Sequence, residues 1–251
     1  MVETLLETHG LRKHFDGTRA VDRISLSLAR ASIVSLIGPN GAGKTTLFNV
    51  VTGFLPPDSG KVFFEGRDVT RMAAFRRARL GIGRTFQEMR LIRRLSALEN
   101  VWLALPNQSG ETVIGALLGR HKREEKRRRA EALRWLKYVG IPETANQLAG
   151  ELSYGQQKLL SVACCLGLGA KLLLLDEPVA GANPALVDRM LELLERLRRE
   201  EGKTIVLIEH NMDAVMQISD RVIVMDEGRI IADGTPEEVR ESVVVIEAYL
   251  S

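Results

Sequence analysis

Three short runs in this chain are almost entirely apolar, at residues 33–37, 172–175 and 204–208. Runs of this length without alternation are typical of parallel strands that are covered on both faces. The last two runs are joined by a stretch with helical spacing, which indicates that strands alternate with helices. The pattern therefore predicts an α/β fold built on a parallel sheet.

A different pattern fills the beginning of the chain. Between Leu5 and Val34, short apolar and polar stretches alternate around the turn signal Phe15-Asp16-Gly17-Thr18. A second turn signal at residues 58–60 leads into the apolar residues 62–64. We expect these segments to be antiparallel strands that accompany the parallel sheet.

Two stretches carry helix start signals. Asn183-Pro184 offers an N-cap followed by proline at the first helical position, and the amphipathic pattern that follows stops at Gly202. Thr235-Pro236-Glu237-Glu238 has the capping-box pattern and predicts one closing helix over residues 235–251.

Residues 90–150 are rich in charge and in helix formers. The run 122–129 holds six Lys and Arg and two Glu, and leads into a helical stripe of apolar residues at 132, 133, 136 and 139. Such a run can bind phosphate or anionic lipid. A solvated helix face, in which Glu and Lys neighbours pair, is the more common reason for it.

The totals limit the classes of function. The chain has 251 residues, with 35 Lys and Arg against 32 Asp and Glu, and this small imbalance predicts no nucleic-acid partner. The first ten residues lack the apolar core of a signal peptide, and Lys171 interrupts the most apolar region. Cys164 and Cys165 are adjacent, which favours reduced, buried thiols. We expect a cytoplasmic protein with no transmembrane segment of its own.

The first candidate binding motif is the loop sequence Gly38-Pro39-Asn40-Gly41-Ala42-Gly43-Lys44-Thr45. It lies between a predicted strand and a predicted helix at 46–51. In that context G-x-x-x-x-G-K-[ST] binds phosphates. Backbone amides and the helix start face the phosphate oxygens, Lys44 reaches the terminal phosphates and Thr45 can ligate Mg²⁺. The loop predicts a bound nucleoside triphosphate, without deciding among kinases, GTPases and transport ATPases.

Two acids, Asp176 and Glu177, follow the apolar run at 172–175. They should lie at the carboxyl edge of the sheet, where α/β folds bind ligands. Asp176 can hold Mg²⁺ and Glu177 can orient or deprotonate a water. His210 follows the next buried strand and should lie at the same edge, while Gln87 offers an amide oxygen to Mg²⁺ or water.

The sequence Leu152-Ser153-Tyr154-Gly155-Gln156-Gln157 precedes an apolar helix at 159–168. Small residues at a helix start form a second possible anion site. Because the loop at 38–45 already surrounds the phosphates of one nucleotide, this second element indicates a second copy of the chain, or a relative.

The ordered motifs resemble the ATP-binding subunits of ABC transporters over nearly the whole chain. They are Phe15, 38–45, Gln87, 152–156, 172–177 and His210. Details at 83–87, 98–101, 180–184, 209–212 and 246–250 are similar to the branched-chain amino acid importer branch. The resemblance implies a P-loop NTPase with a RecA-like parallel sheet core, an antiparallel β subdomain and a helical subdomain. The core would comprise residues 1–87 and 160–251, and the helical subdomain about 88–159.

The resemblance also implies roles for single residues. Phe15 would stack on adenine, residues 38–46, ending in Thr46, would hold the phosphates, and Thr45, Gln87 and Asp176 would approach Mg²⁺. As catalytic residues, Glu177 would polarise the water and His210 would sense the γ-phosphate. Ser153, Gly155 and Gln156 would bind the nucleotide held by the opposing subunit. Tyr154 and Asn183 stand where the commonest family form has glycine and aspartate.

The function expected from the resemblance is an ATPase that uses ATP and Mg²⁺, dimerises around ATP and drives transmembrane permease subunits from the cytoplasmic face of the membrane. The pair could be a homodimer or a heterodimer with a paralogous ATPase subunit. The cargo would be branched-chain or related amino acids, with urea or amide import and lipopolysaccharide export as alternatives. A non-transport ABC-type ATPase stays open, whereas a P-loop kinase leaves 152–157 unexplained and a chromosome-maintenance ATPase would need long heptad insertions.

Overall fold

The computed structural model describes residues 3–85, 90–106 and 121–250, with the backbone alone at 121–123 and 249–250. Gln87 therefore lies outside the described residues. The chain forms two compact units, one made of Met1–Arg84 and Lys171–Ser251 and the other of Thr85–Ala170.

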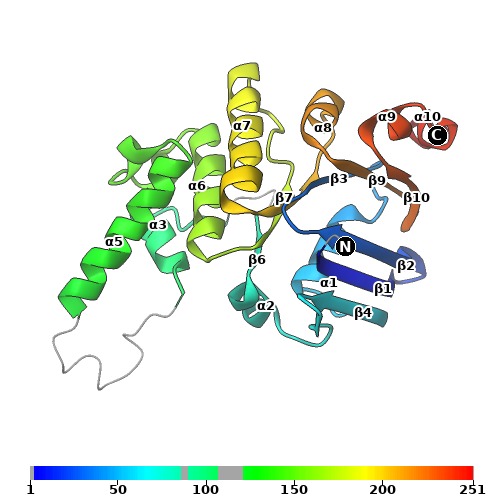
Figure 1. Ribbon diagram of the computed structural model, residues 1–251, viewed down its shortest axis with the longest axis horizontal. Coiled ribbons are helices and arrows are strands. Elements are labelled where there is room, and N and C mark those ends of the chain that lie inside the picture. The colour runs from blue at the N-terminus through cyan, green and yellow to red at the C-terminus, as the bar shows by residue number, and fades with distance from the viewer. Residues whose placement is uncertain (1–2, 86–89, 107–120, 251) are drawn as a thin grey trace. The chain divides into compact units, whose positions relative to one another are not determined.

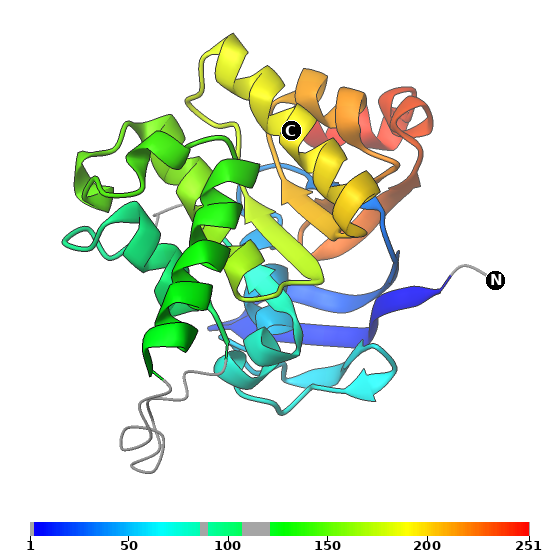
Figure 2. The same ribbon diagram turned by 60° about the vertical axis from the view of Figure 1, so that its left-hand side comes forward.

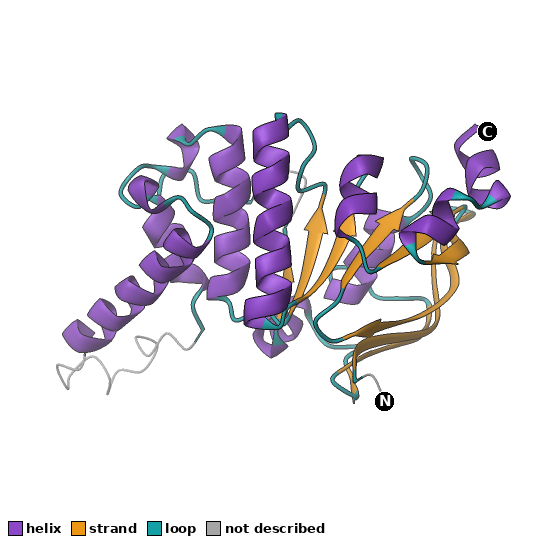
Figure 3. Ribbon diagram, turned by 45° about the horizontal axis from the view of Figure 1, so that its top comes forward, coloured by secondary structure: helices purple, strands orange, loops and turns teal. Residues whose placement is uncertain are grey.

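The first unit contains the parallel sheet that the apolar runs predict. Its six strands lie in the order β10-β9-β3-β8-β7-β6, and every neighbouring pair is parallel except β9 with β10 (Figure 3). The strands are β3 Ile33–Ile37, β6 Ile82–Arg84, β7 Leu172–Asp176, β8 Thr204–Ile208, β9 Arg221–Asp226 and β10 Arg229–Gly234.

Both faces of this sheet are covered, as continuous apolar strands require. One face packs on α1, through Leu47 and Phe48, and on the antiparallel sheet, while the opposite face packs on α8, α9 and α10 through Val215, Val239 and Val245. Figure 1 places α7 and α8 on the side opposite α1. The helices of this unit are α1 Lys44–Thr52, α2 Ala74–Leu80, α7 Pro184–Glu201, α8 Met212–Ile218, α9 Pro236–Arg240 and α10 Val243–Leu250.

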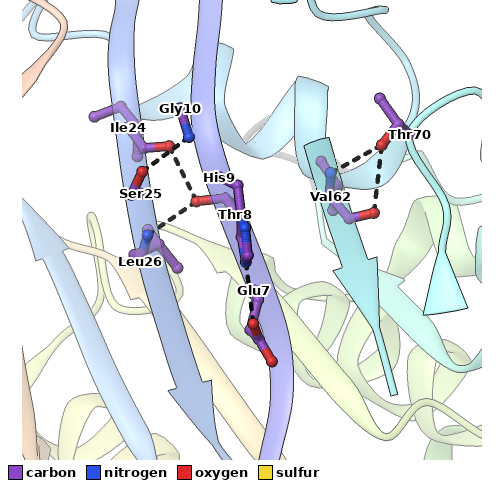
Figure 4. A network of polar contacts seen from close by, with 9 residues as sticks. All are labelled: Glu7, Thr8, His9, Gly10, Ile24, Ser25, Leu26, Val62 and Thr70. Atoms are coloured by element: carbon purple, nitrogen blue, oxygen red, sulfur yellow. Dashed lines mark hydrogen bonds and ion pairs between the residues drawn. The ribbon is translucent and has the colours of Figure 1, made fainter. Parts of the chain in front are cut away.

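The predicted antiparallel strands form a four-stranded sheet in the order β2-β1-β4-β5. Its strands are β1 Thr4–Phe15, β2 Thr18–Ala29, β4 Ser59–Phe64 and β5 Arg67–Asp68. The register of β1 against β2 shifts between Thr8 and Leu11, and side chains bridge the irregularity. The Thr8 hydroxyl accepts from the Leu26 amide at 3.0 Å, and the Gly10 amide donates to the Ser25 hydroxyl at 2.8 Å (Figure 4).

A buried arginine closes the carboxyl end of α1. Arg77 is 1 % exposed, and its guanidinium donates to the carbonyls of Val50 and Val51, at 2.8 and 2.7 Å, and to those of Thr70 and Met72. Val50 and Val51 lie in the last turn of α1, whose carbonyls lack partners within the helix, although Val50 also accepts from the Gly53 amide. Thr70 and Met72 lie in the segment before α2. Burial lowers the pKa of Arg77 to about 10, so the side chain remains a cation at neutral pH and favours the negative end of the helix dipole.

The prediction of a single closing helix is wrong. Thr235 and Glu238 form the expected capping box, but α9 ends at Arg240 and α10 begins at Val243. Ser242 lies between them, and its carbonyl accepts from the amides of Val245 and Ile246. Serine favours the start of a helix over its interior, and the three valines after it are weak helix formers, so the chain starts a new helix there.

The second unit is helical in its described part. Its long helices α3 Ala97–Ala104, α5 His121–Tyr138 and α6 Tyr154–Gly167 lie against one another (Figure 2). Two short 3₁₀ turns, η2 Pro142–Thr144 and η3 Ala149–Glu151, connect α5 to α6. Both cysteines of α6 are free thiols, as predicted, and burial raises the pKa of Cys164. Among the described residues, no helix is both long enough and apolar enough to span a membrane.

Candidate nucleotide site

The glycine loop lies between β3 and α1, and two of its glycines are required by close packing. A Cβ at Gly38 would lie 1.9 Å from the carbonyl oxygen of Met225, and one at Gly43 would lie 1.9 Å from that of Ala20. Both have positive φ angles, 144° and 97°, which favour glycine. The amide of Gly228 donates to the Ala42 carbonyl at 3.1 Å, so the turn between β9 and β10 also fixes the loop.

Lys44 is the first residue of α1, and its side chain returns over the loop. Its ammonium donates to the carbonyls of Gly38 and Pro39, at 2.7 and 2.9 Å. Burial lowers the pKa of Lys44, and the nearby carboxylates of Glu177 and Asp176 partly oppose this effect. A desolvated cation of this kind is stabilised by a polyanion, because added negative charge offsets the cost of its burial.

Asp176 ends β7 and is 7 % exposed. Its Oδ2 lies 3.2 Å from Nη2 of Arg84, the last residue of β6, and Nη1 of Arg84 donates to Oδ1 of Asn49 in α1 at 2.6 Å. The guanidinium also lies over the ring of Phe48, 5.6 Å from its centroid. Arg84 therefore joins the carboxylate at the sheet edge to the helix that begins with the phosphate loop.

Glu177 follows Asp176 in an uncommon conformation for a residue with a side chain, with a φ of 51°. Its amide donates to the carbonyl of Ile208, the last residue of β8, at 2.9 Å. His210 follows β8, and its Nε2 lies 3.5 Å from Oε1 of Glu177. The structure thus brings together Lys44, Asp176, Glu177 and His210 at one edge of the sheet, as the sequence predicts.

Glu209 is a functional candidate that the sequence reasoning missed. It is 2 % exposed, and its Oε1 accepts from the Val179 amide at 2.7 Å, while Oε2 accepts from the His210 amide at 3.2 Å. One carboxylate therefore fixes both the segment after Glu177 and the backbone of His210. Arg84 was also missed. An acid directly after an apolar strand, as Glu209 is, was the available signal for the first; nothing in the local sequence distinguishes Arg84.

Phe15 lies at the end of β1, where it pairs with Thr18 of β2, and its side chain is 42 % exposed. The Lys13 ammonium lies 5.5 Å from the centroid of its ring. Ala20, two residues after Thr18, is the residue whose carbonyl touches the loop at Gly43. An exposed aromatic ring therefore lies close along the chain to Ala20, the β2 residue that contacts the loop.

The sequence at 152–157 belongs to the other unit. Ser153 is exposed and is the N-cap of α6: its hydroxyl accepts from the Gln156 amide at 3.3 Å, and the Gln156 side chain accepts from the Ser153 amide at 3.0 Å. Tyr154 is 48 % exposed, and the Lys158 ammonium lies 4.9 Å from the centroid of its ring. The start of this 14-residue helix lies at the surface, and its role as an anion site stays a prediction.

The residues present fit a nucleoside triphosphate with Mg²⁺. The backbone of the loop packs so closely against the carbonyls of Met225 and Ala20, at Gly38 and Gly43, that no side chain would fit there. Glycine loops of this kind direct backbone amides toward phosphate oxygens. Thr45 is exposed at the start of α1, and Asp176 supplies a carboxylate oxygen. Mg²⁺ commonly takes one or two such protein ligands, with phosphate oxygens and waters completing its shell.

A groove of about 740 Å³ lies away from this site, between α8, α9 and α10. Its lining is mainly apolar, from Met212, Met216, Val239, Val245 and Ile246, with Asp213, Gln217 and Arg240 also contributing. None of the predicted site residues lines it, so we place the chemistry at the phosphate loop.

A parallel sheet whose strand β3 runs into a glycine loop and helix, with two acids at the end of a second strand, defines the class of P-loop nucleoside triphosphatases. Comparison with known proteins narrows this class. A family model described as ABC transporter matches residues 21–180, and one described as branched-chain amino acid ATP-binding cassette transporter matches residues 229–250.

Individual relatives match along the whole chain. The chain is 40% identical to the high-affinity branched-chain amino acid transport ATP-binding protein BraF of Pseudomonas aeruginosa and 42% identical to LivG of Salmonella typhimurium, with 100% of this chain and 99% of each relative covered. A nucleotide-free ATP-binding cassette from an ABC transporter has a TM-score of 0.87 at 32% identity over 99% of both chains. A dimeric post-hydrolysis ATP-binding cassette bound to ADP and Pi has a TM-score of 0.78 at 26% identity, over 92% of this chain and 99% of that chain.

This chain belongs to the ATP-binding subunits of ABC transporters, in the branched-chain amino acid branch of that family. Its activity is ATP hydrolysis coupled to transport. The fold class expected from the sequence, a P-loop NTPase with the ABC ATPase architecture, is confirmed.

Proposed function

We propose that this chain powers the import of branched-chain amino acids through a pair of transmembrane permease subunits. The observation that carries the proposal is the match of residues 229–250 to the branched-chain amino acid cassette family, together with relatives of that name along the full chain. The chain would lie on the cytoplasmic face of the membrane, bound to the permeases, with its helical unit as the surface that receives their cytoplasmic helices.

At the site, Phe15 stacks on the adenine, and residues 38–46 hold the phosphates, with the Lys44 ammonium moving from loop carbonyls to phosphate oxygens. Thr45, Gln87 and Asp176 would hold Mg²⁺, and the bound ion would neutralise charge on the phosphates. Arg84 keeps Asp176 in place against α1.

Glu177 accepts a proton from the attacking water, whose oxygen forms a bond to the γ-phosphorus as the bond to the bridging oxygen breaks. The His210 imidazole would lie between the Glu177 carboxylate and the γ-phosphate and contact both. Its position 3.5 Å from Glu177 is suited to this role. Glu209 acts as a positioning residue, because it fixes the backbone on both sides of this pair.

A second chain completes each site. Ser153, Gly155 and Gln156 lie at an exposed helix start, and we infer that they bind the γ-phosphate of the nucleotide held by the loop of a second copy or of a paralogous ATPase. The dimeric cassette bound to ADP and Pi supports this arrangement. ATP then favours the closed pair, and hydrolysis releases it.

The test is reconstitution of this chain with candidate permease subunits and a candidate substrate-binding protein from the same organism. Leucine, isoleucine or valine, delivered by the binding protein, should raise the ATPase rate and be taken up by proteoliposomes. Uptake of urea or an amide instead, or extraction of lipopolysaccharide, would replace the proposed cargo without changing the site. An ATPase rate that no permease alters would favour a non-transport ABC-type ATPase.

A further inference from the structure

Charge is divided unequally between the two units. Residues 85–170 contain thirteen Lys and Arg against eight Asp and Glu, whereas the rest of the chain has 22 against 24. The net charge of the whole chain, +3, is therefore the sum of +5 on the helical unit and −2 on the nucleotide-binding unit. Charge asymmetry of this kind indicates an anionic partner for the helical unit.

The excess is concentrated on α5. Its buried stripe consists of Ala132, Trp135 and Leu136, and Val139, the first residue after the helix, continues it. Lys126, Arg127, Arg134 and Lys137 are exposed and recur with helical spacing on the opposite side, and we call these four residues the α5 cationic face. Between the first and the last of them, the helix rises about 17 Å.

Three of the four cations on this face, Lys126, Arg127 and Lys137, are not paired with the acids of α5 that the structure describes. Glu124 lies toward Arg128, with 4.0 Å between Oε1 and Nη1, and Arg128 is itself partly buried and donates to the Leu105 carbonyl. Lys126, Arg127 and Lys137 form no ion pair with an acid in the described part of the chain. The Arg134 guanidinium stacks on Trp135, 4.5 Å from the centroid of its ring. Among the described side chains of the run 122–129, the structure shows one paired set of neighbours, Glu124 with Arg128, while Lys126 and Arg127 are exposed and do not form such a pair.

We propose that the α5 cationic face binds the headgroups of anionic phospholipids. A protein partner would select a patch with an apolar centre and few lysines. Here two of the four residues are lysines, and of the large apolar side chains that are exposed in the described chain none lies on α5. Several Lys and Arg side chains on one helix face, without an apolar anchor, are suited to the diffuse negative charge of a lipid surface. The proximity of this face to a membrane rests on the proposed function. Its preference for anionic lipid is independent of that function.

Vesicle co-sedimentation of the full chain tests the proposal. The parent should bind vesicles of equal parts phosphatidylglycerol and phosphatidylcholine, and not pure phosphatidylcholine, with binding that weakens as salt is added. The variant K126Q/R127Q/R134Q/K137Q should bind the anionic vesicles at least about a hundredfold more weakly, since each cation near an anionic surface contributes roughly fivefold. Because Arg134 also packs on Trp135, K126Q/R127Q/K137Q provides a second variant, with an expected loss of about thirtyfold or more.

The matched control is R67Q/R71Q/R79Q/R199Q, which removes four exposed cations from the other unit. It should bind within about threefold of the parent. An equal loss in the control would show that net charge alone drives binding, and unchanged binding of both α5 variants would show that another surface does; either result overturns the proposal. A third result would also overturn the proposal: binding of the parent, but not of the α5 variants, to permeases in neutral vesicles. In that case the α5 cationic face would bind an acidic protein and not lipid.

Discussion

Nε2 of His210 lies 3.5 Å from Oε1 of Glu177. The two residues follow β7 and β8, which are parallel neighbours paired as far as Asp176 and Ile208. Because such strands end at the same edge of a sheet, the pairing register places the proposed base and the proposed sensor of the γ-phosphate in contact. Their separation depends on the backbone, where the Glu177 amide donates to Ile208 and Glu209 holds the His210 amide.

Replacing Glu177 by glutamine removes the proton acceptor and leaves the shape of the side chain. We expect the steady-state ATPase rate to fall by about 10²- to 10⁴-fold, with ATP affinity preserved. Glu192→Gln changes an exposed acid of α7 and should leave the rate unaltered. If the Glu177 variant hydrolyses ATP at the parent rate, another group must activate the water.

Lys44→Ala removes the buried ammonium that lies over the loop. Loss of a charged hydrogen-bond donor should weaken ATP binding by about 1.5–3 kcal/mol, or roughly ten- to a hundredfold, in titration with a fluorescent nucleotide. Lys61→Ala, which changes an exposed residue of β4, is the matched control and should bind ATP normally. Equal affinities of the Lys44 variant and the parent would remove the phosphate loop from the account.

Glu209→Gln tests the positioning role. The variant keeps the volume of the side chain but weakens its bonds to the Val179 and His210 amides. We expect kcat to fall about tenfold or more while the KM for ATP changes little, because the loop is not touched. Asp188→Asn, an exposed substitution in α7, is the control. A rise in KM with kcat unchanged would show that Glu209 supports binding instead.

Arg77→Met should destabilise the nucleotide-binding unit. The substitution removes the guanidinium donor from the buried carbonyls of Val50 and Val51 and the partly buried ones of Thr70 and Met72, while Val50 keeps a second donor, the Gly53 amide. We expect a cost of about 3 kcal/mol or more in the free energy of unfolding. Arg79→Met, on the exposed side of the same helix, should change it by less than about 0.5 kcal/mol. Equal denaturant midpoints for the two variants would contradict the importance of the buried guanidinium.

Glu65 should make the free energy of unfolding fall as the pH is lowered into the acid range. Hydrogen bonds from Lys171, at 2.7 Å, and from Arg30, at 2.9 Å, hold the pKa of Glu65 below its usual range. Because the folded-state pKa is the lower one, this contribution is present above the unfolded pKa of about 4.3 and is lost as the pH falls through the folded value. The pairs are partly exposed, so the effect should be below about 1 kcal/mol. Glu65→Gln should flatten the fall in stability below pH ~5, and an unchanged pH profile would exclude the contribution.

Local patterns predicted most of the fold because the interactions behind them are local. The apolar runs are β3, β7 and β8. Helix α7 begins after Asn183 at Pro184 and ends before Gly202, as the sequence predicts. The closing helix was misjudged because a capping box marks where a helix begins and says nothing of where it ends. The site followed from residues next to strand ends. Arg84 and Glu209 also lie at strand ends, but their roles depend on partners distant in sequence, Asp176 at 92 positions and Val179 at 30. The acid after an apolar strand was a signal for Glu209, and nothing local distinguished Arg84.

The most direct test of the central claim, that a second chain completes each nucleotide site, is the mass in solution of the Glu177→Gln protein with Mg²⁺ and ATP. The chain has a mass of 27.8 kDa, and light scattering should give twice that value with ATP and the single mass with ADP. Adding Ser153→Arg should abolish the pair while leaving ATP bound to the loop. A particle of 27.8 kDa under all conditions, both alone and with a paralogous ATPase subunit added, combined with a parent ATPase rate per chain that does not depend on the concentration of either subunit, would contradict the account.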